Sequence, residues 1–296
     1  MILRFLLFHI INCGDIMITN LINYLYDIDV DYIRKSKSGY IFFYNNSFYI
    51  FKEYYGNKDY LKQIIKLLSK DNLLYHEIIK NKDNNFFSFY NGVIYILLKI
   101  KFNINRRILI NDLLSNNHSV DIVPKKDFLW LKLWSEKIDQ VEYYVFNNLE
   151  KFNIYVISII NYFLSLSELA LNICNYIKME YIPLTLCHKR INFEADLYEY
   201  YCIDNLVIDH YTRDVGEYIK SYIYNNDGGD FAKYIKNMTY DDRCLLLSRI
   251  LFPSYFFDLF DEYILNKKDF SNFDVNFIYL SELNDSINSY LKTFSK

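Results

Sequence analysis

Clustered aromatic and β-branched residues in the first third of the chain predict a small antiparallel sheet. The stretch GYIFFYNNSFYIFKEYYG, residues 39–56, has two such runs on either side of Asn45-Asn46. Paired turn residues between apolar runs are typical of a tight β-hairpin. A strand at YHEIIKN and a second hairpin in NFFSFYNGVIYILLKIK, turning at Asn91-Gly92, complete the predicted layer.

The apolar spacing changes to a helical period in DYLKQIIKLLSK, residues 59–70. Asp59 is a plausible N-cap, and the apolar residues that follow share one face at i, i+3, i+4 and i+7. Beyond Arg107 helical patterns dominate: one after Pro124 with a cap at Asp127, two more separated by Pro253, and a last one capped by Ser281.

The stretch IYVISIINYFLSLSELALNICNYI, residues 154–177, is long and apolar enough to span a bilayer. Polar residues nevertheless recur in it every three or four positions: Ser158, Asn161, Ser165, Glu168, Asn172 and Asn175. Such a stripe would not face lipid, and it is typical of a largely buried helix with one solvent-facing side. We therefore expect no membrane partner.

The order of these elements predicts an α+β protein with segregated layers. A strand-rich part with one helix occupies residues 17–105, and a larger helical part with two short strands occupies residues 106–296. The two short strands are the apolar runs in PLTLCHKR and NLVIDHY. We expect the boundary to be a hinge between lobes, because no Gly/Ser-rich linker occurs there.

The first sixteen residues are expected to be an extension that is not translated. CGDIM can be encoded with GGAG, a ribosome-binding sequence, just before Met17, so we predict that translation begins at Met17. A natively expressed protein whose intact mass includes Met1 would contradict this.

Composition excludes several classes of protein. Apolar residues make up 52% of the chain, which excludes a disordered polypeptide. Net charge is −3 with acidic and basic residues mixed, so no nucleic-acid surface is expected. The five cysteines form no C-x-x-C pair and the five histidines show no ligand spacing, so we expect buried thiols in a cytoplasmic setting and no metal site.

Four stretches in order carry a resemblance to a known superfamily: YIFKEYY before the helix DYLKQIIKLLSK, then LWSEKID, then PLTLCHKR followed by NLVIDHYTRDVGEYIK, and LLLSRILFPSYFFDLFDEY near the end. With this order the chain resembles the kinase-like phosphotransferases, closest to the aminoglycoside-phosphotransferase type and the CotS-type spore-coat kinase-like proteins. The resemblance implies a protein-kinase-like fold of two lobes.

The resemblance also implies roles for individual residues. Lys52 matches the strand lysine that holds nucleotide phosphates, and Asp209 matches the metal-binding aspartate. Asp214 matches a structural aspartate at the start of the following helix, where we expect a cap, and His188 matches a largely structural histidine. From the residues alone, Asp209 is as well explained as the cap of the turn that follows it.

The catalytic loop departs from the family pattern. Arg190 stands where the family has its aspartate base, and Ala195 stands where it has a metal-binding asparagine. A guanidinium group stays protonated and cannot act as a base, and alanine offers no ligand. The helix at residues 59–70 also contains no glutamate to pair with Lys52, and Gln63 is the nearest polar substitute.

These departures favour a catalytically inactive kinase-like protein, or pseudokinase, with a structural or scaffolding role. We expect no catalytic residue, no cofactor and only vestigial cofactor-binding residues, Lys52 and Asp209. The resemblance implies spore-coat or sporulation context, with spore-coat proteins as partners and a cytoplasmic protein that is deposited on the spore. The alternative is an active phosphotransferase, using ATP and Mg²⁺, with Glu194 or Asp196 as a relocated base. A third reading is ligand binding without turnover.

Overall fold

The computed structural model describes residues 13–36, 38–70, 75–101, 106–115, 119–226, 231–266 and 285, and it confirms the predicted α+β class. The chain divides into two compact units. The sheet unit consists of Met1–Arg106 and Asp196–Leu206, and the helical unit consists of Arg107–Ala195 and Val207–Lys296. The segment Asp196–Leu206 differs from the sequence-based division, which placed it with the helical part.

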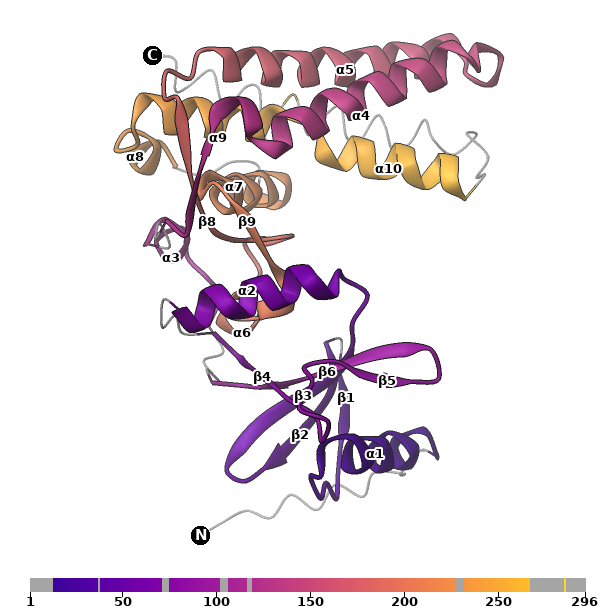
Figure 1. Ribbon diagram of the computed structural model, residues 1–296. Helices are drawn as coiled ribbons and strands as arrows, with labels where there is room; N and C mark the ends of the chain where they lie inside the picture. The colour runs from indigo at the N-terminus through magenta and orange to yellow at the C-terminus, as the bar shows by residue number, and fades with distance from the viewer. Residues whose placement is uncertain are drawn as a thin grey trace. The chain divides into compact units, whose positions relative to one another are not determined.

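The sheet unit contains an antiparallel sheet with the strand order β1-β2-β3-β6-β4, and β5 pairs with β6 (Figure 1). Its strands are β1 Arg34–Ser36, β2 Gly39–Tyr44, β3 Ser47–Glu53, β4 Glu77–Ile79, β5 Ser88–Tyr90 and β6 Val93–Lys99. Its helical segments are α1 Cys13–Tyr26, α2 Lys58–Lys70, α6 Leu197–Tyr200 and the 3₁₀ turn η3 Ile203–Asn205.

Both predicted hairpins are confirmed, and their turns have the geometry that the sequence favoured. Asn45 and Asn46 have φ values of 44° and 58°, and Tyr44 pairs with Ser47 across the turn. Asn91 and Gly92 likewise have φ values of 48° and 80°. Two consecutive left-handed residues match the right-handed twist of the strands they join, which explains the choice of Asn and Gly.

One hydrophobic cluster of the sheet unit lies between α1 and one face of the sheet. Ile18 and Ile22 of α1 are buried together with Phe42, Phe51 and Leu97 of β2, β3 and β6. Met17, the predicted start of translation, lies within α1. Residues 1–12, most of the predicted extension, lie outside the described residues, and the start at Met17 stays a prediction.

The helical unit has a small sheet in the order β7-β8-β9 and a helical core. Its strands are β7 Asp121–Pro124 and β8 Tyr181–His188, with β9 Leu206–Asp209 at the division between the units. Its helical segments are α3 Ile110–Ser115, η1 Lys125–Asp127, α4 Leu129–Phe146, η2 Leu149–Lys151, α5 Ile154–Asn175, α7 Thr212–Asn226, α8 Ala232–Ile235, α9 Tyr240–Leu251 and α10 Ser254–Leu265. Strands β8 and β9 are the two predicted short strands.

Of two predicted helix starts, one is wrong and the other lies outside the described residues. The cap at Asp127 is wrong, because Asp127 belongs to η1 and α4 begins after Phe128, which makes no side-chain cap bond. The helix predicted from Ser281 lies outside the described residues, apart from Asp285. The break at Pro253 is confirmed, since α9 ends at Leu251 and α10 begins at Ser254.

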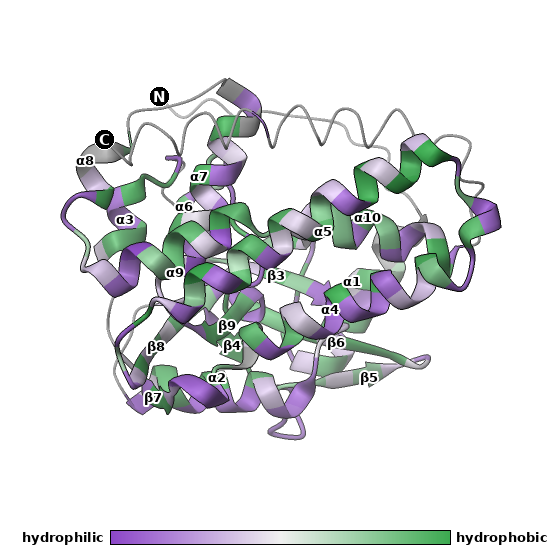
Figure 2. Ribbon diagram, turned by 90° about the horizontal axis from the view of Figure 1, so that it is seen from above, coloured by the Kyte–Doolittle hydropathy of each residue, from purple (hydrophilic) through white to green (hydrophobic). Residues whose placement is uncertain are grey.

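Helix α5 has the two-sided character that its sequence predicted. By length and composition it is one helix that could cross a membrane. All six residues of the predicted polar stripe are exposed, whereas Ile160, Phe163 and Ala170 are fully buried. The buried side packs in the core with α4 and α9, and α5 carries both hydrophobic and hydrophilic segments in Figure 2.

Candidate functional site

The end of β8 and the end of β9 lie side by side in the small sheet, which brings the predicted loop histidine and metal aspartate into one region. Thr185 Oγ1 and Cys187 Sγ of β8 both contact the carbonyl oxygen of Asp209, at 3.4 and 3.5 Å. Cys187 is fully buried, and burial raises the pKa of its thiol well above the usual value, so it stays a neutral packing group.

His188 is a buried structural residue, as predicted. Its side chain is completely inaccessible to solvent, and its backbone N–H donates to Asp214 Oδ1 at 2.8 Å while Nδ1 lies 2.7 Å from Asp214 Oδ2. Asp214 lies in the first turn of α7, but both of its carboxylate oxygens bind His188. The expected capping role of Asp214 is therefore wrong: the residue fastens the loop after β8 to α7.

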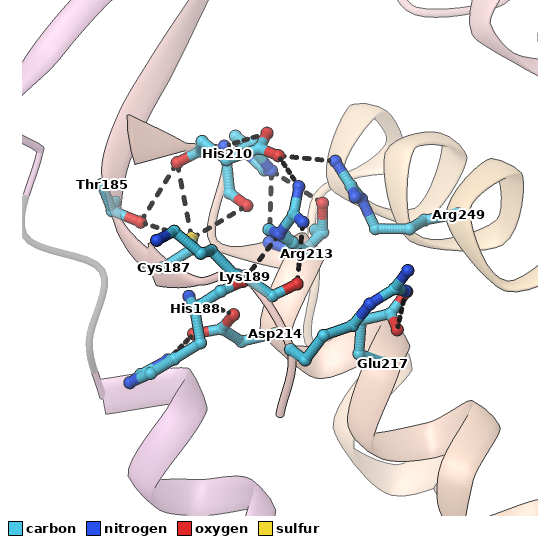
Figure 3. Close-up of polar contacts among 12 residues, drawn as sticks. Thr185, Cys187, His188, Lys189, His210, Arg213, Asp214, Glu217 and Arg249 are labelled. Carbon is cyan, nitrogen blue, oxygen red and sulfur yellow. Dashed lines mark hydrogen bonds and ion pairs between the residues drawn. The ribbon is translucent and has the colours of Figure 1, made fainter. Parts of the chain in front are cut away.

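Asp209 is bound by two guanidinium groups. Its Oδ2 lies 2.9 Å from Arg213 Nη1 and 2.8 Å from Arg249 Nη2, and its Oδ1 accepts the backbone N–H of His210 at 2.7 Å. Figure 3 shows both arginine side chains reaching toward the same position beside His210. Asp209 is only 5% exposed, so protein donors engage both oxygens of the predicted metal ligand.

Arg213 joins Asp209 to the loop that follows β8. Its Nε donates to the carbonyl of His188 at 2.7 Å, and its Nη2 donates to the carbonyl of Lys189 at 3.0 Å (Figure 3). Burial lowers the pKa of Arg213, but the charge and hydrogen bond of Asp209, together with Glu217 and Cys187, raise it by more, and the net shift is upward. The guanidinium is thus a permanent cation with its donors directed at three acceptors.

Arg249 reaches Asp209 from α9, a helix that sequence order alone does not bring near β9. Its guanidinium lies over the ring of Trp130 at 4.9 Å and over that of Trp134 at 5.7 Å. Gly216 of α7 allows this approach, because a Cβ there would lie 3.3 Å from Arg249 Cγ. Stacking on two indole rings compensates part of the cost of burying this cation.

Arg190, at the position of the family's base, belongs to an ion-pair cluster. It pairs with Asp258 of α10 and lies 3.7 Å from Glu217 of α7. Glu217 in turn lies 2.9 Å from Lys220, and both side chains are buried. Burial raises the pKa of Glu217, but Lys220 and neighbouring arginines lower it by more, so the carboxylate stays ionised and holds its partners.

Ala195, at the position of the family's metal-binding asparagine, is a buried packing residue. It is 4% exposed, and its carbonyl accepts the backbone N–H of Ile108. Its methyl group has no donor atom for a metal, which agrees with the interpretation of the sequence.

The two residues considered as a relocated base, Glu194 and Asp196, each interact with another group of the protein. Glu194 is exposed and lies 3.8 Å from Arg107. Asp196 caps α6 by accepting the backbone N–H of Glu199 at 2.8 Å, and it belongs to the sheet unit.

Lys52 lies on β3 in the sheet unit and pairs with Asp204 of η3, Nζ to Oδ2 at 2.6 Å. Asp204 therefore takes the place of the glutamate that α2 lacks. Its side chain is 13% exposed and that of Lys52 is 21% exposed. Glu53, the next residue, is exposed on the other face of the strand.

The sequence analysis missed Asp204, Arg213 and Arg249. Arg213 had a local signal, since it follows Asp209 by four residues at the start of a helix. Asp204 and Arg249 had none, because 152 residues separate Lys52 from Asp204 and 40 residues separate Asp209 from Arg249. Only the fold brings each pair together.

The profile of the family described as "Spore coat putative kinase YutH" matches residues 19–293. The chain belongs to the YutH family. The endospore coat-associated protein YutH of Bacillus subtilis is 26% identical over 170 residues, which cover 47% of this chain and 47% of that protein. The chain thus aligns with about half the length of this relative.

Solved structures show the fold that this YutH-family chain shares. A spectinomycin phosphotransferase in complex with ADP and spectinomycin matches with a TM-score of 0.53 at 14% identity, covering 92% of this chain and 97% of that one. An aminoglycoside phosphotransferase from Alicyclobacillus acidocaldarius matches with a TM-score of 0.63 at 10% identity, covering 91% and 93%. The kinase-like fold inferred from four sequence stretches is therefore confirmed.

An active enzyme with a kinase-like fold binds ATP together with a divalent metal ion. Within the described ranges, no group of three or more His, Cys, Asp or Glu side chains is placed to hold a metal ion. The one expected carboxylate ligand, Asp209, is covered by two arginines. A divalent cation here would have to displace Arg213 and Arg249 and would then face both charges. The residues at this position do not fit a metal.

Proposed function

We propose that this YutH-family chain is a catalytically inactive kinase-like protein that serves a structural role in the spore coat. The observation that carries the proposal is the double ion pair on Asp209, with Oδ2 within 2.9 Å of both Arg213 and Arg249. In phosphoryl transfer the metal ions bridge the phosphates and neutralise developing charge. Here two fixed cations have replaced the ion without offering coordination sites.

The loop after β8 supports the same proposal. Phosphoryl transfer to a hydroxyl needs a group that orients the acceptor and accepts its proton. Arg190 stands in that position, carries a permanent positive charge and is bound by Asp258 and Glu217. Loss of the base and of the metal site together leaves positioning alone, which is insufficient for useful turnover.

A place in the spore coat is supported by the name of the family and of its relative in Bacillus subtilis, both of which refer to the spore coat. The partners would be other coat proteins, and the chain would be made in the cytoplasm before deposition on the spore. A shape-preserving role agrees with the way the former catalytic elements are used. Asp214, Arg213 and Asp209 now tie the end of β8, the end of β9 and α7 together.

The test of inactivity is a phosphoryl-transfer assay with the full chain, ATP, Mg²⁺ or Mn²⁺, and a panel of aminoglycosides, small hydroxyl compounds and coat proteins. We expect transfer at the level of the protein-free control, with the same low value for Lys52→Ala. Transfer above that level that disappears in Lys52→Ala would overturn the proposal.

The test of location is fractionation of spores that carry a tagged copy of the chain. We expect the tagged protein in the coat fraction, and we expect spores with Lys52→Ala to retain it there. Recovery of the protein only in the soluble fraction of the mother cell or the spore core would contradict a coat role.

A further inference from the structure

A pocket of about 280 Å³ lies in the helical unit beside the arginines that bind Asp209. Helix α4 contributes Trp130 and Trp134 to its wall, and the segment around Pro253 contributes Phe252 and Phe257. The Trp134 and Phe252 rings are stacked with their centroids 3.9 Å apart. The pocket thus has a flat aromatic side, and its volume fits a small molecule better than a nucleotide.

Two buried N–H donors that belong to this wall have no hydrogen-bond partner within the described part of the chain. They are Trp130 Nε1 and Arg249 Nε. Trp130 is 6% exposed and Arg249 is 5% exposed, so bulk water does not compensate for them. A buried donor without an acceptor costs about 1–3 kcal/mol, so a ligand that supplied acceptors here would remove that cost.

The charge around the pocket is positive. Among the described residues, six cationic side chains line it: Lys137, Lys189, Arg190, Arg213, Lys220 and Arg249. The lining also contains Glu217 and Asp258, and two further carboxylates, Asp209 and Asp261, pair with lining cations from outside. Within the described lining itself, cationic side chains therefore outnumber carboxylates by six to two.

We propose that this pocket binds a small oxyanion, a phosphate or carboxylate, carried on an aromatic or other flat apolar group. The oxyanion would accept from Trp130 Nε1 and Arg249 Nε, and the apolar part would pack on Trp134, Phe252 and Phe257. Buried donors that bind an anion form the stronger, charge-assisted kind of hydrogen bond. This binding needs no metal and no phosphoryl transfer, and it stands whether or not the chain is inactive as a kinase.

The ligand proposed for this pocket differs from a nucleotide, the usual ligand of a kinase-like fold. A nucleotide is larger than the pocket and would bring a metal ion, which the surrounding cations disfavour. A dianion such as a phosphate monoester matches the mainly cationic lining, whereas a cation of the same shape does not.

The experiment measures binding by calorimetry and thermal shift on the full chain with phenyl phosphate, benzoate, inorganic phosphate and, as the cationic control, benzamidine. We expect phenyl phosphate to bind most tightly, inorganic phosphate and benzoate more weakly, and benzamidine not at all. Affinity should fall as salt is raised, because charge contributes to it. Equal binding of benzamidine and phenyl phosphate, or no binding of any anion at millimolar concentration, would overturn the proposal.

Trp130→Phe locates the binding, because it removes the indole N–H and keeps an aromatic ring beside Arg249. We expect about tenfold weaker binding of phenyl phosphate, as for the loss of one hydrogen bond to a charged group. Folding should be little affected, since the lost donor has no partner in the unbound protein. Lys132→Gln, on an exposed face of the same helix, is the matched control and should bind as the unchanged chain does.

The position of the bound anion is given by the comparison of these two variants. A Trp130→Phe protein that keeps its stability and binds phenyl phosphate as tightly as the unchanged chain would place the anion elsewhere and refute the assignment. The result is separable from the proposed function, which is tested by phosphoryl transfer from ATP and involves neither phenyl phosphate nor Trp130.

Discussion

Lys52 in the sheet unit and Asp209 in the helical unit, the two residues predicted to be vestiges of a nucleotide site, have different surroundings. In the sheet unit Lys52 forms an ion pair with Asp204, and about a fifth of its side chain is exposed. In the helical unit Asp209 has two ion pairs, and the side chains of Asp209 and Arg249 are 7% and 6% exposed. A lysine with one ion pair can exchange its partner for another anion, whereas freeing Asp209 would leave the buried Arg249 and the partly exposed Arg213 without their shared carboxylate.

The difference shows that two charged residues of one fold can be compensated to very different degrees. Lys52 keeps the charge and strand position that a phosphate would need, because one compensating carboxylate is enough to satisfy it. Asp209 is packed against α7 and α9 and paired with an arginine from each helix. Removing one of these charged side chains would leave a remaining charge buried without its partner, which costs stability. The comparison therefore predicts unequal effects of mutation in the two units.

The largest effect is expected for Arg249→Met. Methionine preserves much of the volume against Trp130 and Trp134 but removes the cation that binds Asp209, and breaking a buried ion pair costs about 3–5 kcal/mol. Urea unfolding monitored by circular dichroism measures this loss. Arg243→Met, on the same helix, is the control and should lose less than about 1 kcal/mol. Equal losses for the two variants would show that the ion pair is not the stabilising element.

An intermediate effect is expected in the sheet unit when the pH is lowered. His76 is 2% exposed; its Nδ1 accepts the backbone N–H of Lys101 and its Nε2 lies 3.0 Å from the Tyr198 carbonyl. Burial lowers the pKa of His76 from 6.5 to about 4, although the Tyr198 carbonyl, Asp204 and Asp196 partly oppose the shift. The neutral imidazole ring can make both hydrogen bonds. Protonation of Nδ1 would break the bond that it accepts from the Lys101 N–H.

The sign of the pH effect follows from that lowered pKa. Between pH 6.5 and 4 the unfolded chain binds a proton that the folded chain does not, so stability falls as the pH falls through this range. The loss from His76 approaches about 3 kcal/mol below pH 4. Unfolding curves at a series of pH values should show a shallower slope for His76→Gln than for the unchanged chain. Equal slopes of stability against pH for the two proteins would show that His76 does not cause the loss of stability.

The smallest effect is expected for the Lys52–Asp204 pair. Because both side chains keep some access to water, their coupling in a double-mutant cycle with Lys52→Met and Asp204→Asn should be about 1 kcal/mol. The cycle is measured by chemical unfolding. A coupling as large as the loss in Arg249→Met would erase the proposed difference between the two units.

Local patterns in the sequence predicted the elements well and the site poorly. The turns at Asn45-Asn46 and Asn91-Gly92 and the polar stripe of α5 could be found because the residues that determine them are neighbours in the chain. Strand β7 was missed because its four residues pair with β8 across a distance in sequence that no period reveals. The expected cap at Asp127 failed because a 3₁₀ turn precedes α4.

The candidate site depended on contacts over long separations. Arg190 and Ala195 could be located from the sequence alone. Their side chains led to the prediction that the loop lacks a proton-accepting base and a metal ligand. The sequence could not show that Asp209 is neutralised, because Arg249 comes from a helix near the end of the chain. It also treated Lys52 as lacking a partner, since only the folded chain brings Asp204 of η3 to β3.

The guanidinium groups of Arg213 and Arg249 differ from a bound ion in one further respect: they are covalent parts of the chain. A dissolved metal leaves its ligands when chelators compete for it or when its concentration drops, but these two charges remain at fixed stoichiometry. The region around Asp209 should therefore keep its shape in EDTA and in calcium-rich or magnesium-depleted surroundings alike. An architecture held by charges that belong to the chain is insensitive to the mineral content around it.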